Sequence, residues 1–389
     1  MHLFTYHNPT TLFFGKGQII AIRRAIPEKH KVLVLYGGGS VKKNSVLDQV
    51  RAALSKHTFT EFGGIEPNPT YETLMSAVEL ARREGIDYLL AVGGGSVIDG
   101  AKFIAAAVPF EGKDPWEIVE KHAPVTKTPL PLSCVLTLPA TGSESNNGAV
   151  ISHAGKGIKR PFFHPQLYPV FAVLDPTTTY TLPLKQIGNG VVDAFVHVAE
   201  QYLTTPAQGY VQDYYAEGLL KTLLEVGPQT LQHPLDYEAR ANFMWVANQA
   251  LNGLIGVGVP QDWSTHMIGH ELTAMYGLDH AQTLAAIFTQ NLRVRRKAKR
   301  AKLLQYAHRV WQIPATTDEE KAIDMAIDKT AAFFEVMGLK SSLAKLKIER
   351  EVIEKLPARL QESGQTALGE HGEVTPVVAK QILMASMEA

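Results

Sequence analysis

The 389-residue chain contains one cysteine, Cys134, which excludes an internal disulfide. A single thiol fits a reducing compartment, so we expect a cytoplasmic protein. The chain has no excess of either charge, with 38 acidic and 38 basic residues, and this balance gives no reason to expect nucleic acid or a membrane surface as a partner. It also lacks an apolar run of the roughly 20 residues that span a bilayer. The N-terminal sequence MHLFTYHNPT has no signal-peptide pattern.

Short β-rich runs alternate with amphipathic stretches in the first half of the chain. Such alternation predicts βαβ units, in which helices cover both faces of a parallel sheet. The expected strands are Val32–Leu35, Thr58–Phe62, Tyr88–Val92, Leu132–Leu136 and Val170–Leu174. The expected helices between them are Ser45–Leu54, Tyr71–Glu84 and a stretch that ends near Ala107.

After Leu182-Pro183 the strand pattern stops and successive helical stretches follow. The expected helices are Ile187–Tyr202, Val211–Leu224, Tyr237–Leu254, Trp263–Tyr276, one from His280 onward, and Asp318–Val336. The predicted fold is therefore an α/β N-terminal domain, residues 1–182, followed by an all-α C-terminal domain, residues 183–389. The basic cluster Arg293–Lys302 lacks interleaved aromatics, so we expect a solvated helix face and not a nucleic-acid patch.

A glycine-rich turn, Gly93-Gly94-Gly95-Ser96, follows the expected third strand and leads to Asp99. Glycines between a buried strand and a helix let backbone amides approach a phosphate closely. The same residues have a ligand-free explanation, with Ser96 as the helix N-cap and Asp99 as the acidic member of a capping box. The two interpretations are compatible, because side chains can cap a helix whose backbone amides face a ligand.

Two further polar loops follow expected strands. The loop Gly37-Gly38-Gly39-Ser40 continues into two lysines and has no acid before Asp48. An acid at such a position often binds the ribose hydroxyls of NAD, so its absence favours the 2′-phosphate of NADP(H). The other loop carries hydroxyls and amides from Thr137 through Thr141 to Asn146, and is either an ordinary polar connection or a third ligand-binding loop.

The helical half contains a carboxylate and several histidines at helical spacing. Asp193 and His197 stand four residues apart in the apolar stretch Gly190–Glu200, which places both on one face of a helix. They could form a buried Asp–His hydrogen bond or one half of a metal site. Three further histidines, His266, His270 and His280, lie within fifteen residues. Imidazoles combined with a carboxylate suit Zn²⁺ or Fe²⁺ better than Mg²⁺ or Ca²⁺, so we expect one divalent metal.

Together these motifs closely resemble the iron-containing (group III) alcohol dehydrogenase family along essentially the whole chain. They also look like its bacterial NADPH-dependent aldehyde reductase or butanol dehydrogenase branch. The motifs are Phe14-Gly-Lys-Gly, Tyr36-Gly-Gly-Gly-Ser40, Gly93-Gly-Gly-Ser-Val-Ile-Asp99, Leu138-Pro-Ala-Thr-Gly-Ser-Glu-Ser-Asn146 and Gly258-Val-Pro-Gln-Asp-Trp263. Two local departures, Asp279-His280-Ala281 and the shortened Leu138–Glu144 motif, bear on substrate range.

The resemblance implies a dehydroquinate synthase-like fold with the active site in the cleft between a dinucleotide domain and a helical metal domain. It implies that the metal ligands are Asp193, His197, His266 and His280. His270 is then either a proton relay or a wall histidine, and we count it with Asp99 as a candidate catalytic residue. The predicted cofactor contacts are Gly37, Gly38, Gly39, Ser40, Gly94, Gly95, Ser96, Asp99 and Thr141 from the loops, with Asn68, Thr137, Asn146 and Lys159 added by the resemblance.

The function expected is metal-assisted, NADPH-dependent reduction of small aldehydes to primary alcohols by a homodimer. Two other classes stay open from the sequence: a metal- and NAD-dependent lyase of the dehydroquinate synthase type, and a non-catalytic dinucleotide sensor. The lyase would need basic residues around an anionic substrate, whereas the residues beside the histidines are mostly Phe, Trp, Met and Leu. The sensor would need no metal.

Overall fold

The structure is a computed structural model that describes residues 1–121 and 127–389. These residues form two compact units, each discontinuous in sequence. The unit that we call the sheet unit comprises His7–Pro183 and Pro234–Asn252. The other, the helical unit, comprises Met1–Tyr6, Leu184–His233 and Gly253–Ala389. That residues 1–182 bind the dinucleotide and residues 183–389 bind the metal stays a prediction.

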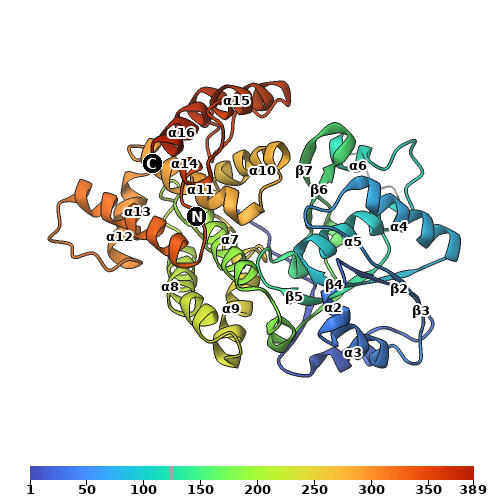
Figure 1. The fold of residues 1–389 in the computed structure, drawn as a ribbon. Coiled ribbons are helices and arrows are strands. Elements are labelled where there is room, and N and C mark those ends of the chain that lie inside the picture. The colour runs from blue at the N-terminus through green and yellow to red at the C-terminus, as the bar shows by residue number, and fades with distance from the viewer. Residues whose placement is uncertain (122–126) are drawn as a thin grey trace. The chain divides into compact units, whose positions relative to one another are not determined.

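Six parallel strands of the described residues form the sheet, in the order β1-β8-β5-β4-β2-β3. Figure 1 labels the neighbouring strands β5, β4, β2 and β3. Their bounds are β1 Thr11–Phe14, β2 Lys31–Tyr36, β3 Thr58–Phe62, β4 Tyr88–Gly94, β5 Leu132–Leu138 and β8 Phe171–Leu174. All strands expected from the sequence are present. The predicted α/β fold of the N-terminal half is therefore confirmed.

Alternate residues of each central strand enter two different cores, because successive side chains of a strand point to opposite faces. Leu33 and Leu35 of β2 pack under α4 (Tyr71–Glu84) and α5 (Gly95–Ala107). Val32 and Val34 belong to the core on the other face, to which η1 Gln18–Ala21, α1 Ile22–Ala25 and α3 Val46–Ala53 also contribute. Two-sided burial explains why these strands are continuous apolar runs.

An antiparallel hairpin, β6 (Gly148–His153) and β7 (Ile158–Phe163), was not expected from the sequence. Its strands contain Pro161 and several charged or polar residues, which weakens the alternation that predicts a strand. The sheet unit also contains α2 Ser40–Lys43, α6 Glu117–Glu120, η2 Ser143–Ser145, η3 Ala154–Lys156, η4 Pro165–Leu167, η5 Pro176–Thr179 and α9 Tyr237–Ala250.

The helical unit is built around α11, which packs against α7, α10, α13 and α16. Its helices are α7 Leu184–Tyr202, α8 Tyr210–Gln232, α10 Ser264–Tyr276, α11 His280–Val294, α12 Arg300–Arg309, α13 Glu319–Val336, α14 Leu343–Leu346, α15 Val352–Glu362 and α16 Pro376–Glu388. The predicted all-helical character is confirmed. Among the described residues, no helix combines the length and the apolarity that a membrane crossing requires.

The expected end of the second helix of this unit, at Leu224, was wrong. Helix α8 continues through Pro228 to Gln232, although an internal proline removes a backbone hydrogen bond. A Cβ at Gly227 would come within 2.9 Å of a methyl carbon of Val191 on α7. We infer that this close packing on α7 holds the extra turns of α8 in helical form.

The expected solvated face at Arg293–Lys302 was wrong in part. Arg293, Arg296 and Arg300 do pair with acidic residues at the start of α13. Arg295 and Lys299, by contrast, are only 5% and 2% exposed. They reach buried carboxylates, so this segment has an inner charged side that its sequence does not reveal.

Candidate metal centre and dinucleotide loops

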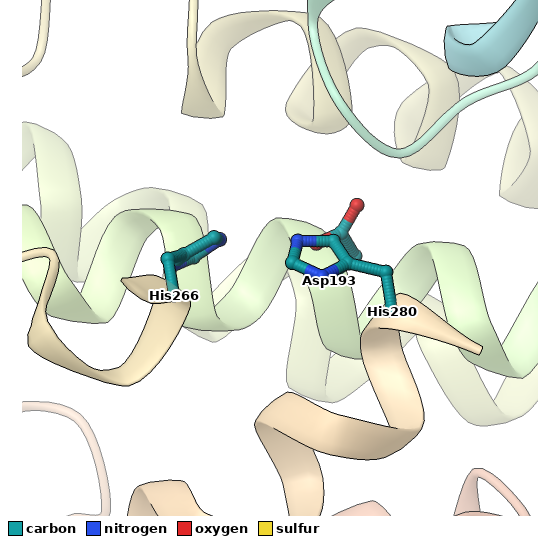
Figure 2. A group of neighbouring side chains, drawn as sticks. All are labelled: Asp193, His266 and His280. Atoms are coloured by element: carbon teal, nitrogen blue, oxygen red, sulfur yellow. The ribbon is translucent and has the colours of Figure 1, made fainter. Parts of the chain in front are cut away.

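Three side chains from three helices of the helical unit form a group that could hold a metal ion (Figure 2). They are Asp193 of α7, His266 of α10 and His280 of α11, and one ligand atom of each lies within 4.8 Å of the others. His280 Nε2 is 3.8 Å from Asp193 Oδ1. Ligand atoms of a tetrahedral zinc site lie about 3.4 Å apart. The group thus needs only small side-chain shifts to hold such an ion, and its donors fit Zn²⁺ or Fe²⁺.

Local backbone geometry brings the two histidines together. Helix α10 is capped at its C-terminal end by Gly277, whose φ of +64° is a left-handed conformation that glycine adopts without strain. The chain then turns within three residues, so that His280 is the first residue of α11. The ring centroids of His266 and His280 are consequently 5.3 Å apart.

The two other histidines of the predicted site adjoin this group. His197 lies one turn after Asp193, with Nδ1 3.7 Å from Asp193 Oδ1, and its ring stacks on His266 at 4.5 Å. Its role as the fourth ligand stays a prediction. His270 is buried, with its ring 5.1 Å from that of His280, and its role in proton transfer also stays a prediction.

A buried carboxylate, Glu200, lies behind His266. It accepts hydrogen bonds from Thr265 N and His266 N and contacts His266 Nδ1. Burial, together with the nearby carboxylate of Asp262, raises the pKa of Glu200. The N–H groups of Thr265 and His266 oppose this effect, because hydrogen bonds to the carboxylate favour its charged form.

In the sheet unit, the three predicted loops follow β2, β4 and β5, which are neighbours in the sheet. Carboxyl ends of adjacent parallel strands are where ligands bind in open α/β sheets. Lys159 Nζ donates to Asn68 Oδ1 at 2.8 Å, and Asn68 N donates to Ser96 Oγ at 3.3 Å. The structure thus brings together three predicted cofactor residues from three separate segments.

The capping-box interpretation of Ser96 and Asp99 was wrong. Helix α5 begins at Gly95, so its N-cap residue is Gly94, which has no side chain to cap the helix, and not Ser96. The Asp99 carboxylate instead accepts hydrogen bonds from Ser143 Oγ at 2.6 Å and Val150 N at 2.9 Å. Asp99 therefore ties α5 to the third loop and to β6.

Lys102, which is fully buried in α5, holds the third loop from the inside. Its ammonium donates to Ser143 Oγ, Asn146 Oδ1 and Gly148 O at 2.7–2.9 Å. Burial lowers the pKa of Lys102 to about 8. Asn146 Nδ2 donates in turn to Leu251 O at 3.1 Å. Asn146, a predicted cofactor residue, is thereby fixed in place by protein groups.

The glycines of the loops differ in the structural role that each one has. A Cβ at Gly95 would come within 2.5 Å of Thr141 Oγ1, so this position is needed for close packing of two predicted loops. Gly39 has a φ of +97°, where other residues are strained. A Cβ at Gly38 would meet open space, so Gly38 leaves the backbone of the first loop accessible.

Glu144, in the third loop, yields a prediction about stability. The carboxylate is 1% exposed; Oε1 accepts from Asn248 Nδ2 at 2.9 Å, while Oε2 has no hydrogen-bond partner among the described residues. Burial raises the pKa of Glu144 above its ordinary value of 4.5, so the free energy of unfolding should fall as pH rises above that value. Glu144→Gln removes this charge and is expected to stabilise the protein by about 1 kcal/mol near pH 8.

Urea denaturation at about pH 5 and about pH 8 measures the effect, which should be small at the lower pH. Glu79→Gln changes an exposed glutamate of α4 and serves as the control. Equal or lower stability of Glu144→Gln near pH 8, relative to the native protein, would contradict the argument.

Two family models match the chain: iron-containing alcohol dehydrogenase over residues 9–176, and the C-terminal model of the Fe-containing alcohol dehydrogenase family over residues 188–373. The chain belongs to the iron-containing alcohol dehydrogenase family. The resemblance seen in the sequence is thus confirmed.

Relatives within this family match along their whole length. The NADPH-dependent aldehyde reductase YqhD of Escherichia coli is 55% identical over 99% of this chain and 100% of its own. The NADH-dependent butanol dehydrogenase B of Clostridium acetobutylicum is 39% identical over 98% of this chain and 97% of its own. The crystal structure of E. coli YqhD matches with a TM-score of 0.97 at 54% identity, covering 99% of each chain. The dehydroquinate synthase-like fold is confirmed.

Two residues of this family member that support the predicted sites were missed from the sequence. Lys102 carried a usable signal, since it is the only charge between Gly100 and Ala107 in an otherwise apolar helix. Glu200 carried a weaker signal, because its spacing from Asp193 and His197 places it on the same helix face, but a glutamate near the end of a helix is usually solvated. Its partners, Thr265 and His266, lie more than sixty residues away in sequence.

Proposed function

We propose that this protein is an NADPH-dependent, metal-assisted aldehyde reductase that acts reversibly on short-chain aldehydes and primary alcohols. The observation that carries the proposal is the group of Asp193, His266 and His280, in a chain 55% identical to a protein named NADPH-dependent aldehyde reductase. A fall in NADPH absorbance on addition of butanal tests it. A lyase or a dinucleotide sensor would leave NADPH unconsumed.

In the helical unit, Asp193, His197, His266 and His280 hold the metal. A bound Fe²⁺ or Zn²⁺ would supply Lewis-acid polarisation of the aldehyde oxygen. Asp193 contributes the one negative charge of the ligand set, which offsets part of the cation's charge in a buried setting. We assign proton delivery to His270, because its ring lies beside that of His280.

In the sheet unit, the loops after β2, β4 and β5 bind the dinucleotide, with Asn68, Ser96 and Lys159 as a connected polar group. NADPH would supply the hydride. Gly94, Gly95, Thr137 and Thr141 shape the loops around it. Asp99, which we counted as catalytic, acts through Ser143 and Val150 by fixing the third loop.

The first loop, Gly37–Lys43, is proposed to select NADPH by receiving the 2′-phosphate. Lys42 lies over the ring of Tyr36, with Nζ 4.8 Å from the centroid, so one of the two loop lysines is held against the end of β2. Placing a carboxylate here, by Ser40→Asp, should repel the phosphate. We expect kcat/KM for NADPH to fall about 10–100-fold, with kcat/KM for NADH unchanged or higher.

Initial rates with butanal and each cofactor measure this selection. Ser55→Asp makes the same change at an exposed serine outside the loop and should leave the cofactor ratio unaltered. A native protein that prefers NADH, or a Ser40→Asp variant with the native ratio, would rule out this role for the loop.

The proposal includes a cytoplasmic homodimer. A lone, buried Cys134 suits a reducing compartment. Strand β1 pairs with β8 along one side and lies at an edge of the sheet, where a second copy could add a strand. Size measurement in solution tests the dimer.

A further inference from the structure

We infer that Glu200 is a positioning residue for His266, and that it sets the metal affinity of the site by fixing which nitrogen of His266 faces the ion. This inference rests on the proposed metal-dependent function. Glu200 does not belong to the ligand group itself. It acts from behind one member of that group.

The Glu200 carboxylate meets His266 at two atoms. Oε1 accepts from Thr265 N at 2.6 Å, while Oε2 accepts from His266 N at 3.3 Å and contacts His266 Nδ1. An ionised carboxylate can only accept in these bonds. Oε1 and Oε2 already accept from two backbone N–H groups, which stabilise the ionised form, and with Glu200 ionised the hydrogen is on Nδ1. The imidazole is then in the tautomer whose Nε2 lone pair can bind a cation. Figure 2 shows the His266 ring directed toward Asp193 and His280.

One face of α7 carries both a candidate metal ligand, Asp193, and the residue that orients His266, Glu200. Asp193, His197 and Glu200 are at helical spacings of four and three residues, which places them on the same side of α7. Asp193 offers a ligand atom directly, whereas Glu200 orients a ligand that another helix carries. The relative position of α7 and α10 is thus tied to the geometry of the metal group.

The start of α10 is anchored on the same side. Asp262 N donates to the backbone oxygen of Glu200 at 3.0 Å, and Asp262 Oδ1 accepts from Ser264 N at 2.9 Å. The other oxygen of Asp262 contacts Arg295 and Lys299. The first N–H groups of α10 therefore all have fixed acceptors, and His266 is held on a rigid turn.

A purely structural role for Glu200, as an acceptor for the first N–H groups of α10, makes a different prediction. Loss of such a cap lowers the free energy of unfolding, but it would lower metal affinity equally whether or not His266 is present. A role through His266 should disappear when the imidazole is removed. A double-mutant cycle separates the two roles.

The test is the Zn²⁺ affinity of the metal-free, full-length protein, measured by competition with a chromogenic chelator. Glu200→Gln places an amide donor against either Thr265 N–H or His266, and is expected to weaken Zn²⁺ binding about 10–100-fold. In a His266→Ala background, Glu200→Gln should weaken it further by less than about 3-fold. Equal losses in both backgrounds, or no loss in either, would overturn the inference.

Glu217→Gln is the matched control. Glu217 is 4% exposed and Glu200 is 3% exposed, and Glu217 accepts from Tyr202 and Gln305 away from the metal group. Its Zn²⁺ affinity should stay within about 2-fold of native. NADPH binding by each variant confirms that it is folded.

A measurement on the native protein covers the case in which Glu200→Gln does not fold. In the Co²⁺-loaded protein, the Nδ1–H of His266 should give a hyperfine-shifted, exchangeable proton signal that is lost in His266→Ala. Absence of that signal in the native protein overturns the inference. If the native protein bound no metal, or did not oxidise NADPH with butanal, the proposed function itself would fail. If the native protein did both and Glu200→Gln kept the native Zn²⁺ affinity, only the role of Glu200 would be refuted.

Discussion

Asp193→Asn is expected to lower kcat/KM for butanal by at least about 10³-fold and to leave the purified protein with substoichiometric metal. Asp193 supplies the only negative charge of the predicted ligand set, and its carboxylate faces both His197 and His280. Loss of carbonyl polarisation by a bound ion removes several kcal/mol of transition-state stabilisation. Elemental analysis and steady-state rates of the same preparation measure both effects.

Asp213→Asn makes the same chemical change elsewhere in the helical unit. Asp213 pairs with Lys302 and accepts from Gln305 Nε2 at 3.0 Å. This control should retain metal and activity even if it loses some stability. An Asp193→Asn protein that kept one metal per chain and native kcat/KM would show that Asp193 is not a ligand.

Asp262→Asn is expected to lower the free energy of unfolding by about 3 kcal/mol at neutral pH. Asp262 lies between Arg295 and Lys299, and all three residues are at most 6% exposed. Removing one partner from a buried charged group leaves the others uncompensated, which typically costs about 3–5 kcal/mol. Glu370, 2.8 Å from Lys299, retains part of the compensation, so we expect the lower end of that range.

The pH dependence of this effect has a definite sign. Burial alone would raise the pKa of Asp262, but Lys299 and Arg295 lower it below its ordinary value of 3.8. A depressed carboxyl pKa contributes stability that is fully present above the ordinary value and is lost as pH falls below it. The difference between the native protein and Asp262→Asn should therefore shrink in acid.

Chemical denaturation at several pH values measures this difference. The half-exposed pairs of Asp324 with Arg293 and Arg296 provide a control. Asp324→Asn should cost less than about 1 kcal/mol, because ion pairs that solvent reaches contribute little. If Asp262→Asn and Asp324→Asn lowered the free energy of unfolding equally, the buried charges around Asp262 would contribute no more than the pairs of Asp324.

Much of the fold could be predicted because its signals are local. The strands of the sheet are short apolar runs between turn residues, and α4 begins and ends at the residues that its pattern indicates. The hairpin β6–β7 and the last turns of α8 could not be predicted in this way. Their conformation depends on packing against α5 and α7, which are distant in sequence.

In the candidate site, too, the features with a local sequence pattern could be predicted and those that depend on distant partners could not. The spacing of Asp193 and His197 and the cluster of histidines indicated a metal group, and the structure gathers Asp193, His266 and His280. The sequence of Ser96–Asp99 suggested a capping box, but the carboxylate bonds to Ser143 and Val150 instead. A local pattern cannot choose between a partner three residues away and one more than forty residues away.

The groups that support the site were hidden for a related reason. Glu200, Arg295 and Lys299 are charged residues whose usual place is the surface. They are buried here because each meets an opposite charge or a polar group from a segment that is distant in sequence. Such compensation depends on tertiary contacts, which one sequence does not display.

Metal content and NADPH oxidation, measured on the same purified protein, test the central claim most directly. We expect about one Fe²⁺ or Zn²⁺ per chain, butanal-dependent oxidation of NADPH in preference to NADH, loss of that activity on chelation, and its return when metal is restored. Full NADPH-dependent reduction of butanal by protein from which the metal has been removed would contradict the account.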